Sequence, residues 1–359
     1  MQIINNYRVE IEEAVEQLRR MNVSRVLVQS PLGLRGVAAS VAEQLKSNKF
    51  EVLMSSSNCW GGCDIAYTEA SGLDVDAIIH LGHSRFLRHD KLPTIYLECR
   101  YADPSPVYDL MDRIAAELTG YKKVGVGASV QWLDYLSFVK ESLARRGVDA
   151  VTAMPDMYSV YESQVLGCDV SALKKLEKNV DCFLVLGSVF HGLGIAVSSS
   201  KPVYAADPHT QRVENLDKMR ERILRQRYAQ IIRFRESRTV GVLVSIKPGQ
   251  KRLGLAKKLN NILNQHGKNS TIVSADEITS ATILENGFEA FVNTACPRLS
   301  IEDQSRFTKP VLLPVEALVA VGLMEWETVV EHGFLMYPWG WHDRKVGERF
   351  WRGVSLLQV

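Results

Sequence analysis

The cysteine spacing of this 359-residue sequence lacks the pairs that many metal sites use. Its six cysteines form no C-x-x-C pair, which argues against a zinc ribbon or zinc finger. No apolar run reaches the ~18 residues of a membrane helix. The opening residues, MQIINNYRVEIEEAVEQL, lack the basic stretch and apolar run of a secretory signal. We therefore expect a cytoplasmic protein with no membrane partner, whose cysteines serve metal binding, catalysis or packing rather than disulfides.

An excess of either charge is also absent. Lys and Arg number 43 and Asp and Glu 41, which gives a net charge of +2. Such a balance lacks the basic surplus typical of nucleic-acid binding, so we expect no nucleic-acid partner. The hydrophobic fraction of 46% is ample for a large core, and the length suggests two or three domains.

One pattern occurs three times along the chain. Short apolar runs follow Asp76, Asp181 and Glu289, at intervals of 105 and 108 residues. Three further apolar runs, around Pro93, Pro202 and Pro310, each end on an acid, namely Glu98, Asp207 and Glu316. Three more apolar runs begin near residues 25, 123 and 240, and each is followed by an amphipathic segment. These segments are 36–47, 133–147 and 252–268.

Alternation of short apolar runs with helical segments is typical of βαβ units and parallel sheets. We therefore predict an α/β fold of three similar parallel-sheet, Rossmann-like units in a pseudo-threefold arrangement. The units should cover residues 1–107, 108–215 and 216–330, followed by a C-terminal extension, 331–359. Ligands of such sheets bind beyond the carboxyl ends of the strands, which would here point to a common centre.

Two cysteines occupy the same place in two of the repeats. Cys63 and Cys168 each stand thirteen residues before the acid that opens the next apolar run. The matching residue of the third unit is Asp276, and there Cys296 follows the run itself. We expect a helix after Cys63 and after Cys168, and a helix N-terminus favours a thiolate.

Three thiolates on loops at strand ends suit an iron–sulfur cluster. They leave one iron of a 4Fe–4S cluster without a protein ligand and open to a small molecule. The alternative is three buried cysteines that only pack, since free cysteine is often buried. Cys99 and Cys182 lie at or in apolar runs and are expected in the core, whereas Cys59 is a possible alternate ligand.

Several motifs together resemble the archaeal 2-(3-amino-3-carboxypropyl)histidine synthase family of diphthamide biosynthesis. They are WGGCD at 60–64, GHS at 82–84, SVQW at 129–132, QVLGC at 164–168, FHGLGIA at 190–196, KPVYAADPHT at 201–210, KPGQKR at 247–252 and VNTACPR at 292–298. The resemblance implies a radical enzyme in which Cys63, Cys168 and Cys296 bind a 4Fe–4S cluster. It also implies transfer of a 3-amino-3-carboxypropyl group from S-adenosylmethionine to a histidine of translation elongation factor 2, releasing 5′-methylthioadenosine.

The resemblance further implies a homodimer. Because neither a second cluster motif nor a flavin fingerprint is visible, we expect an external electron donor. Candidate S-adenosylmethionine contacts lie on loops at strand ends and are Gln29, Gln131, Ser188, His191, Asp207 and Gln250. The aromatic stretch 336–344 is interpreted as a packing tail or as a wall near the substrate entry.

Two other functions stay open on the sequence alone. The first is a quinolinate-synthase-like lyase, from a family that also resembles a triplicated α/β fold with three cysteines and an open iron. Such a lyase would need no protein substrate. A non-catalytic iron–sulfur partner subunit would need the ligands but no pocket for S-adenosylmethionine. Release of methylthioadenosine would exclude the first, and binding of S-adenosylmethionine would argue against the second.

Overall fold

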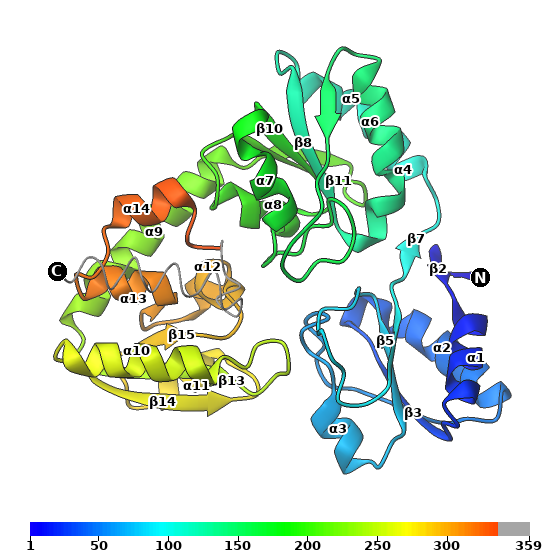
Figure 1. The fold of residues 1–359 in the computed structure, drawn as a ribbon, viewed down its shortest axis with the longest axis horizontal. Helices are drawn as coiled ribbons and strands as arrows, with labels where there is room; N and C mark the ends of the chain where they lie inside the picture. The colour runs from blue at the N-terminus through cyan, green and yellow to red at the C-terminus, as the bar shows by residue number, and fades with distance from the viewer. Residues whose placement is uncertain (337–359) are drawn as a thin grey trace.

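A computed structural model describes residues 1–336 of the chain. Figure 1 shows three lobes, coloured blue to cyan, green, and yellow to orange, and each contains one mainly parallel sheet. The strands of the first lobe are β3 (Arg25–Gln29), β4 (Glu51–Met54), β5 (Ala77–Leu81) and β6 (Thr94–Leu97). Those of the second are β8 (Lys123–Ala128), β9 (Asp149–Val151), β10 (Cys182–Leu186), β11 (Val203–Asp207) and β12 (Arg212–Asn215). Those of the third are β13 (Thr239–Ser245), β14 (Asn269–Ala275), β15 (Ala290–Asn293) and β16 (Val311–Leu312).

The parallel strands follow one order in all three lobes. The sheets run β4-β3-β5-β6, β9-β8-β10-β11 and β14-β13-β15-β16, so the first strand of each lobe is always second in the sheet. The second sheet gains β12, which pairs antiparallel with β11. A separate antiparallel sheet joins β1 (Gln2–Ile4), β2 (Tyr7–Val9) and β7 (Arg100–Tyr101). The predicted α/β class with parallel sheets is confirmed.

Helices connect the strands and link the lobes. In the first lobe they are α1 (Ile11–Arg20), α2 (Arg35–Ser47) and α3 (Tyr67–Gly72). In the second they are α4 (Ser105–Tyr108), α5 (Met111–Glu117), α6 (Leu136–Ala144), α7 (Ser171–Leu176) and α8 (Val189–Ala196). The remaining helices are α9 (Asp217–Glu236), α10 (Leu253–Gln265), α11 (Ser280–Glu285), α12 (Arg298–Ile301), α13 (Pro314–Ala320) and α14 (Trp326–His332). In Figure 1 the long α9 runs from the second lobe to the third.

The helix expected over 133–147 is divided. A 3₁₀ segment, Val130–Tyr135, precedes α6, and two of its aromatic residues, Trp132 and Tyr135, are buried in the core. Short 3₁₀ turns at a helix start are common because they tighten the first turn.

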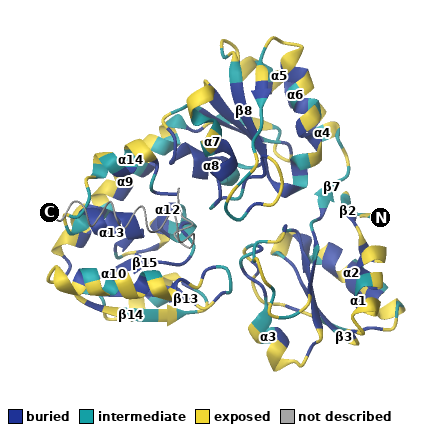
Figure 2. Ribbon diagram, viewed as in Figure 1, coloured by how far each residue is buried: buried dark blue, intermediate teal, exposed yellow. Residues whose placement is uncertain are grey.

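Both faces of the central strands β5, β10 and β15 are buried, whereas the edge strands β4, β12 and β14 are partly exposed. Figure 2 shows this burial by colour. Side chains alternate along each strand, so Val26 and Val28 enter one core cluster and Leu27 enters the other. In the third lobe Val240 and Val242 face one cluster. Their neighbour Gly241 lies opposite Phe291, and a Cβ on this glycine would approach the phenyl ring to 2.7 Å.

The three acids that mark the repeat share one structural task. Each accepts hydrogen bonds from two successive backbone N–H groups at the start of the first strand of its lobe. The acceptors are Asp76 for Ser24 and Arg25, Asp181 for Lys122 and Lys123, and Glu289 for Arg238 and Thr239. These backbone hydrogen bonds lower the pKa of all three carboxyl groups. The periodic acids therefore mark a repeated contact, here called an acid clamp. In each lobe the acid before the third strand binds the backbone at the start of the first strand.

The expectation that Glu316 ends a strand like Asp207 is wrong. Strand β16 stops at Leu312, and Glu316 lies in α13, where it is fully buried. Its carboxylate accepts two hydrogen bonds from the buried guanidinium of Arg227 on α9. A charge can be buried there because it is paired, so this acid joins two helices instead of closing a strand.

Within residues 1–336, no helix combines the length and the apolar character that a membrane crossing requires.

We predict that Gly241→Ala destabilises the protein by about 1–3 kcal/mol, because its methyl group would overpack the core against Phe291. Urea unfolding followed by circular dichroism measures the loss. The matched control is Gly254→Ala in α10, where no atom lies within 4 Å of the added Cβ. Equal stability of the two variants would contradict the predicted packing constraint.

Candidate functional site

Three cysteines from the three lobes line one cavity of about 520 Å³. Cys63 lies between β4 and α3, and Cys168 lies between β9 and α7, so both occupy the same connection of their lobes. Cys296 follows β15, the third strand of its lobe in chain order. All three loops leave the carboxyl ends of parallel strands, as predicted from the repeat.

The three thiols lie within electrostatic reach of one another. Burial raises the pKa of Cys63 to about 12, and nearby Cys296 adds to the effect. Burial, then Cys296 and Cys63, raises the pKa of Cys168 well above its ordinary value, and burial raises that of Cys296. The expectation that helix N-termini favour thiolates at Cys63 and Cys168 is therefore wrong for the metal-free thiols. Desolvated thiols that repel one another as anions suit a metal centre, which takes the place of their protons.

The loop that carries Cys63 is fixed by the third lobe. The backbone N–H of Gly249 donates to the carbonyl of Cys63 at 2.8 Å. The amide of Gln250 donates to the Cys63 sulfur at 3.4 Å. A Cβ at Gly249 would come within 2.6 Å of Cys63, so only glycine permits this approach. Gln250 therefore touches the sulfur as well as the cavity.

An ion-pair group lies directly beside this loop. Lys247, which is 7% exposed, donates to Asp64 at 2.8 Å and to Glu277 at 2.7 Å. Burial opposes its charged form, but these two hydrogen bonds raise the pKa of Lys247. Trp60 also donates its indole N–H to Glu277 at 3.1 Å. The cysteine loop of the first lobe is thus held to the third lobe by charge as well as by backbone.

The second lobe is joined to the first around the same cavity. The amide of Gln131 donates to the carbonyl of Gly82 at 2.8 Å, and that of Gln164 donates to the Ser84 hydroxyl at 2.6 Å. Phe86 and Tyr158 stack with ring centroids 4.2 Å apart. The second and third lobes meet where the Arg298 guanidinium lies 3.5 Å from the centre of the Phe190 ring.

The candidate S-adenosylmethionine contacts fall into two groups. Gln131, His191 and Gln250 line the cavity. The Ser188 hydroxyl lies behind the wall, 3.1 Å from Nδ1 of His191. Burial, with Arg298 nearby, lowers the pKa of His191 to about 4, so its ring is neutral at physiological pH. Asp207 ends β11 and accepts the backbone N–H of His209 at 2.9 Å.

Gln29 lies beneath the cavity at the end of β3 and is buried. Its amide donates to the carbonyl of Asp64 at 2.7 Å, and its oxygen accepts the backbone N–H of Ala66 at 3.1 Å. The same oxygen lies 3.0 Å from Nδ1 of His80. Gln29 therefore braces the Cys63 loop from below.

Two of the three remaining cysteines lie in the core, as expected. Cys99 and Cys182 are buried, and Cys182 lies inside β10, which confirms their core placement. Cys59 is also buried, close to His80 and His83. Apart from Met336, the aromatic stretch 336–344 lies outside the described residues.

Sequence reasoning missed three residues of the cavity wall. Lys247 and Arg298 stand within the quoted motifs KPGQKR and VNTACPR, and His83 stands in GHS. Their motifs were visible, but only the fold shows that these polar side chains reach the cavity of the three cysteines.

The fold and the site define an α/β protein with several parallel sheets and a buried three-cysteine centre in one cavity. A family model described as "Putative diphthamide synthesis protein" matches residues 30–330. The chain is 35% identical to a 2-(3-amino-3-carboxypropyl)histidine synthase from Pyrococcus horikoshii, over 89% of this chain and 92% of that protein. It is 23% identical to subunit 1 of the synthase from Schizosaccharomyces pombe, over 92% of this chain and 77% of that protein.

Solved structures show the same likeness. The crystal structure of Dph2 from Pyrococcus horikoshii with a 4Fe-4S cluster matches with a TM-score of 0.81 and 35% identity, covering 89% of this chain and 92% of that one. The chain belongs to the diphthamide synthesis protein family.

We predict that Lys247→Met destabilises the protein by about 3–5 kcal/mol, because it leaves the buried Asp64 carboxylate without its cation. Thermal or urea unfolding measures the change. In the control, Lys175→Met, the half-exposed pair with Asp156 is lost, and the expected change is below about 1 kcal/mol. A similar effect of both substitutions would show that the Lys247 group does not hold the lobes together.

Proposed function

We propose that Cys63, Cys168 and Cys296 bind one 4Fe–4S cluster. The observation that carries this proposal is the convergence of three desolvated thiols, one from each lobe, on a single cavity. The structural relative from Pyrococcus horikoshii contains such a cluster, which supports it further. When bound, the reduced cluster supplies one electron and an iron without a protein ligand.

We propose that the protein transfers the 3-amino-3-carboxypropyl group of S-adenosylmethionine to a histidine of translation elongation factor 2. The bond between sulfur and the γ-carbon breaks after uptake of one electron, which releases 5′-methylthioadenosine. A carbon–carbon bond to the imidazole forms, the ring gives one proton to solvent, and it returns the electron taken up at the start, so the transfer is redox-neutral overall. The name of the relative that shares 35% of its residues supports this reaction class.

The chain's own residues bind and orient the cosubstrate in this proposal. The cationic sulfonium is attracted to the thiolates of the cysteine centre. Neutral His191, together with Gln131 and Gln250, offers hydrogen bonds along the cavity wall. Arg298 offers a fixed positive charge to the carboxylate of the methionine moiety. Ser188 orients His191, whereas Asp207 and Gln29 fix the loops around the wall.

We also propose that residues 1–107, 108–215 and 216–330 are three copies of one Rossmann-like unit in a pseudo-threefold arrangement, followed by the extension 331–359. The common strand order and the three acid clamps support this division. A homodimer, a separate electron donor and a cytoplasmic location complete the proposal. They rest on the family resemblance and on the sequence.

We predict that Cys63→Ala, Cys168→Ala and Cys296→Ala each reduce the iron bound after anaerobic reconstitution, because each removes a cluster ligand. Iron and sulfide analysis, with the broad visible absorption of thiolate-bound clusters, measures the loss. The matched controls are Cys99→Ala and Cys182→Ala, which remove buried thiols outside the cavity. Loss of the cluster on Cys182→Ala alone would refute the ligand assignment.

We predict that the dithionite-reduced protein converts S-adenosylmethionine to 5′-methylthioadenosine rather than to 5′-deoxyadenosine. The ligands come from three lobes, and this cavity is proposed to present the γ-carbon, not the 5′-carbon, to the open iron. Chromatography of the nucleosides identifies the broken bond. Mass spectrometry of elongation factor 2 then locates the added group on one histidine.

Dominance of 5′-deoxyadenosine would exclude this reaction even if the three cysteines bind the cluster. Absence of any S-adenosylmethionine cleavage would favour a lyase or a partner subunit instead.

A further inference from the structure

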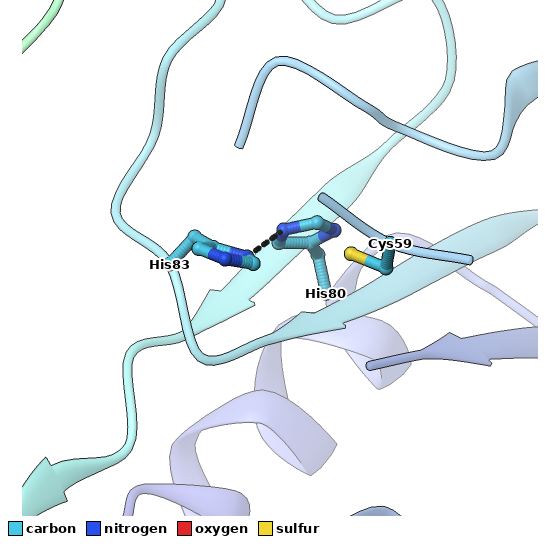
Figure 3. A group of neighbouring side chains, drawn as sticks. All are labelled: Cys59, His80 and His83. Carbon is cyan, nitrogen blue, oxygen red and sulfur yellow. Dashed lines mark hydrogen bonds between the residues drawn. The ribbon is translucent and has the colours of Figure 1, made fainter. Parts of the chain in front are cut away.

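A second group of metal-binding side chains lies beside the three-cysteine centre. The Cys59 sulfur and one ring nitrogen each of His80 and His83 lie within 4.8 Å of one another. Figure 3 shows His80 between His83 and Cys59, with the Cys59 sulfur directed toward the His80 ring. His80 is fully buried in β5, Cys59 is 8% exposed, and His83 reaches the cavity wall. The proposed cluster and reaction use none of these three side chains.

The spacing of the two rings fits a shared metal ion. Nε2 of His80 lies 3.0 Å from Nδ1 of His83. Two imidazole nitrogens bound tetrahedrally to one zinc ion, at about 2.0–2.1 Å each, lie about 3.3 Å apart. In the metal-free protein these two nitrogens share a hydrogen bond. A metal bound to both would replace this hydrogen bond, with the rings a few tenths of an ångström further apart and the His83 proton moved to its Nε2. Cys59 then completes a three-ligand set of the kind that leaves a fourth position open.

The tautomer of His80 is already set for metal binding. The amide orientation of Gln29 is fixed, because its nitrogen donates to Asp64 and its oxygen accepts from Ala66. Nδ1 of His80 faces this oxygen at 3.0 Å and therefore carries the proton. Nε2 is left with its lone pair directed at the group. A metal-bound histidine usually donates its other ring N–H to an acceptor, and the Gln29 oxygen is in the position of this acceptor.

The charge states of the free side chains agree with this geometry. Burial lowers the pKa of His80 well below its ordinary value and that of His83 to about 4, so both rings are neutral. Burial raises the pKa of Cys59 to about 12. A bound divalent cation would exchange with the thiol proton and form a metal–sulfur bond, with release of one proton and no change of oxidation state.

We propose that Cys59, His80 and His83 form a second metal site, which takes Zn²⁺ or a similar borderline divalent cation. Two imidazoles and one thiolate are the ligand set that such ions prefer. The site borders the cavity, because His83 and the neighbours of Cys59, Asn58 and Trp60, line it. A water or a polar group of a cavity ligand can occupy the open fourth position.

The test measures zinc in the reconstituted holoenzyme. After anaerobic cluster assembly, one equivalent of Zn²⁺ is added, unbound metal is removed, and zinc and iron are counted by mass spectrometry. We expect one zinc per chain in addition to the cluster iron. Cys59→Ser and His83→Gln should each lower zinc affinity at least tenfold while the cluster absorption remains. The matched control, Cys99→Ala, removes another buried thiol of the same lobe and should retain the zinc.

A second measurement examines the site in a chain that cannot assemble the cluster. Co²⁺ is added to the full chain in which the three cluster cysteines are replaced by serine. Thiolate-to-cobalt absorption with intense tetrahedral bands is expected, and it should vanish on Cys59→Ser. Failure to retain zinc, zinc that displaces cluster iron, or cobalt bands that persist without Cys59 would each overturn the proposal. These outcomes are independent of methylthioadenosine release, so they leave the proposed reaction unaffected.

Discussion

The structure depends on bringing three desolvated thiols together from positions 63, 168 and 296. Each thiol lies on a loop beyond a parallel strand, and each strand belongs to a different sheet. The thiolate forms repel one another and are poorly hydrated, so without a metal the pKa values rise. A bound cation or cluster reverses this cost, because it neutralises the sulfurs and needs no water around them. Much of the binding free energy at this centre is therefore also free energy of holding the three lobes together.

Polar contacts join the lobes around the cavity. Gln131 and Gln164 each donate across the boundary of the first two lobes, and Gly249 donates to the carbonyl of Cys63 from the third. Hydrogen bonds fix direction as well as distance, which an apolar interface does less strictly. The loops that carry Cys63 and Cys168 are thus each joined to another lobe by a hydrogen bond.

The strands, their parallel class and the cysteine ligand candidates could be predicted from sequence, because apolar periodicity and repeat spacing are local signals. The acids Asp76, Asp181 and Glu289 were visible as markers, but their clamp on the first strand became clear only from the fold. Glu316 could not be placed from sequence, because a helix-buried acid and a strand-end acid have the same sequence neighbourhood.

Contacts between distant segments could not be predicted in the same way. Lys247 meets Asp64 across 183 positions of the chain, and no pattern within either motif reveals this partner. The pKa values of the thiols likewise depend on burial by all three lobes. A short motif identifies which residue types are present, whereas the charge that they can carry is decided by the whole fold.

Gln29 shows how the two metal-binding groups are mechanically related. One side chain donates to the backbone of Asp64, next to Cys63, and accepts from the ring of His80. A shift of the Cys63 loop therefore changes the orientation of the amide that sets the His80 tautomer. In the other direction, a metal bound to Nε2 of His80 would strengthen the hydrogen bond from its Nδ1 to the Gln29 oxygen. Gln29, and with it the Cys63 loop, would then be held more firmly. Since both groups border one cavity, an ion at either one alters the field and the rigidity at the other.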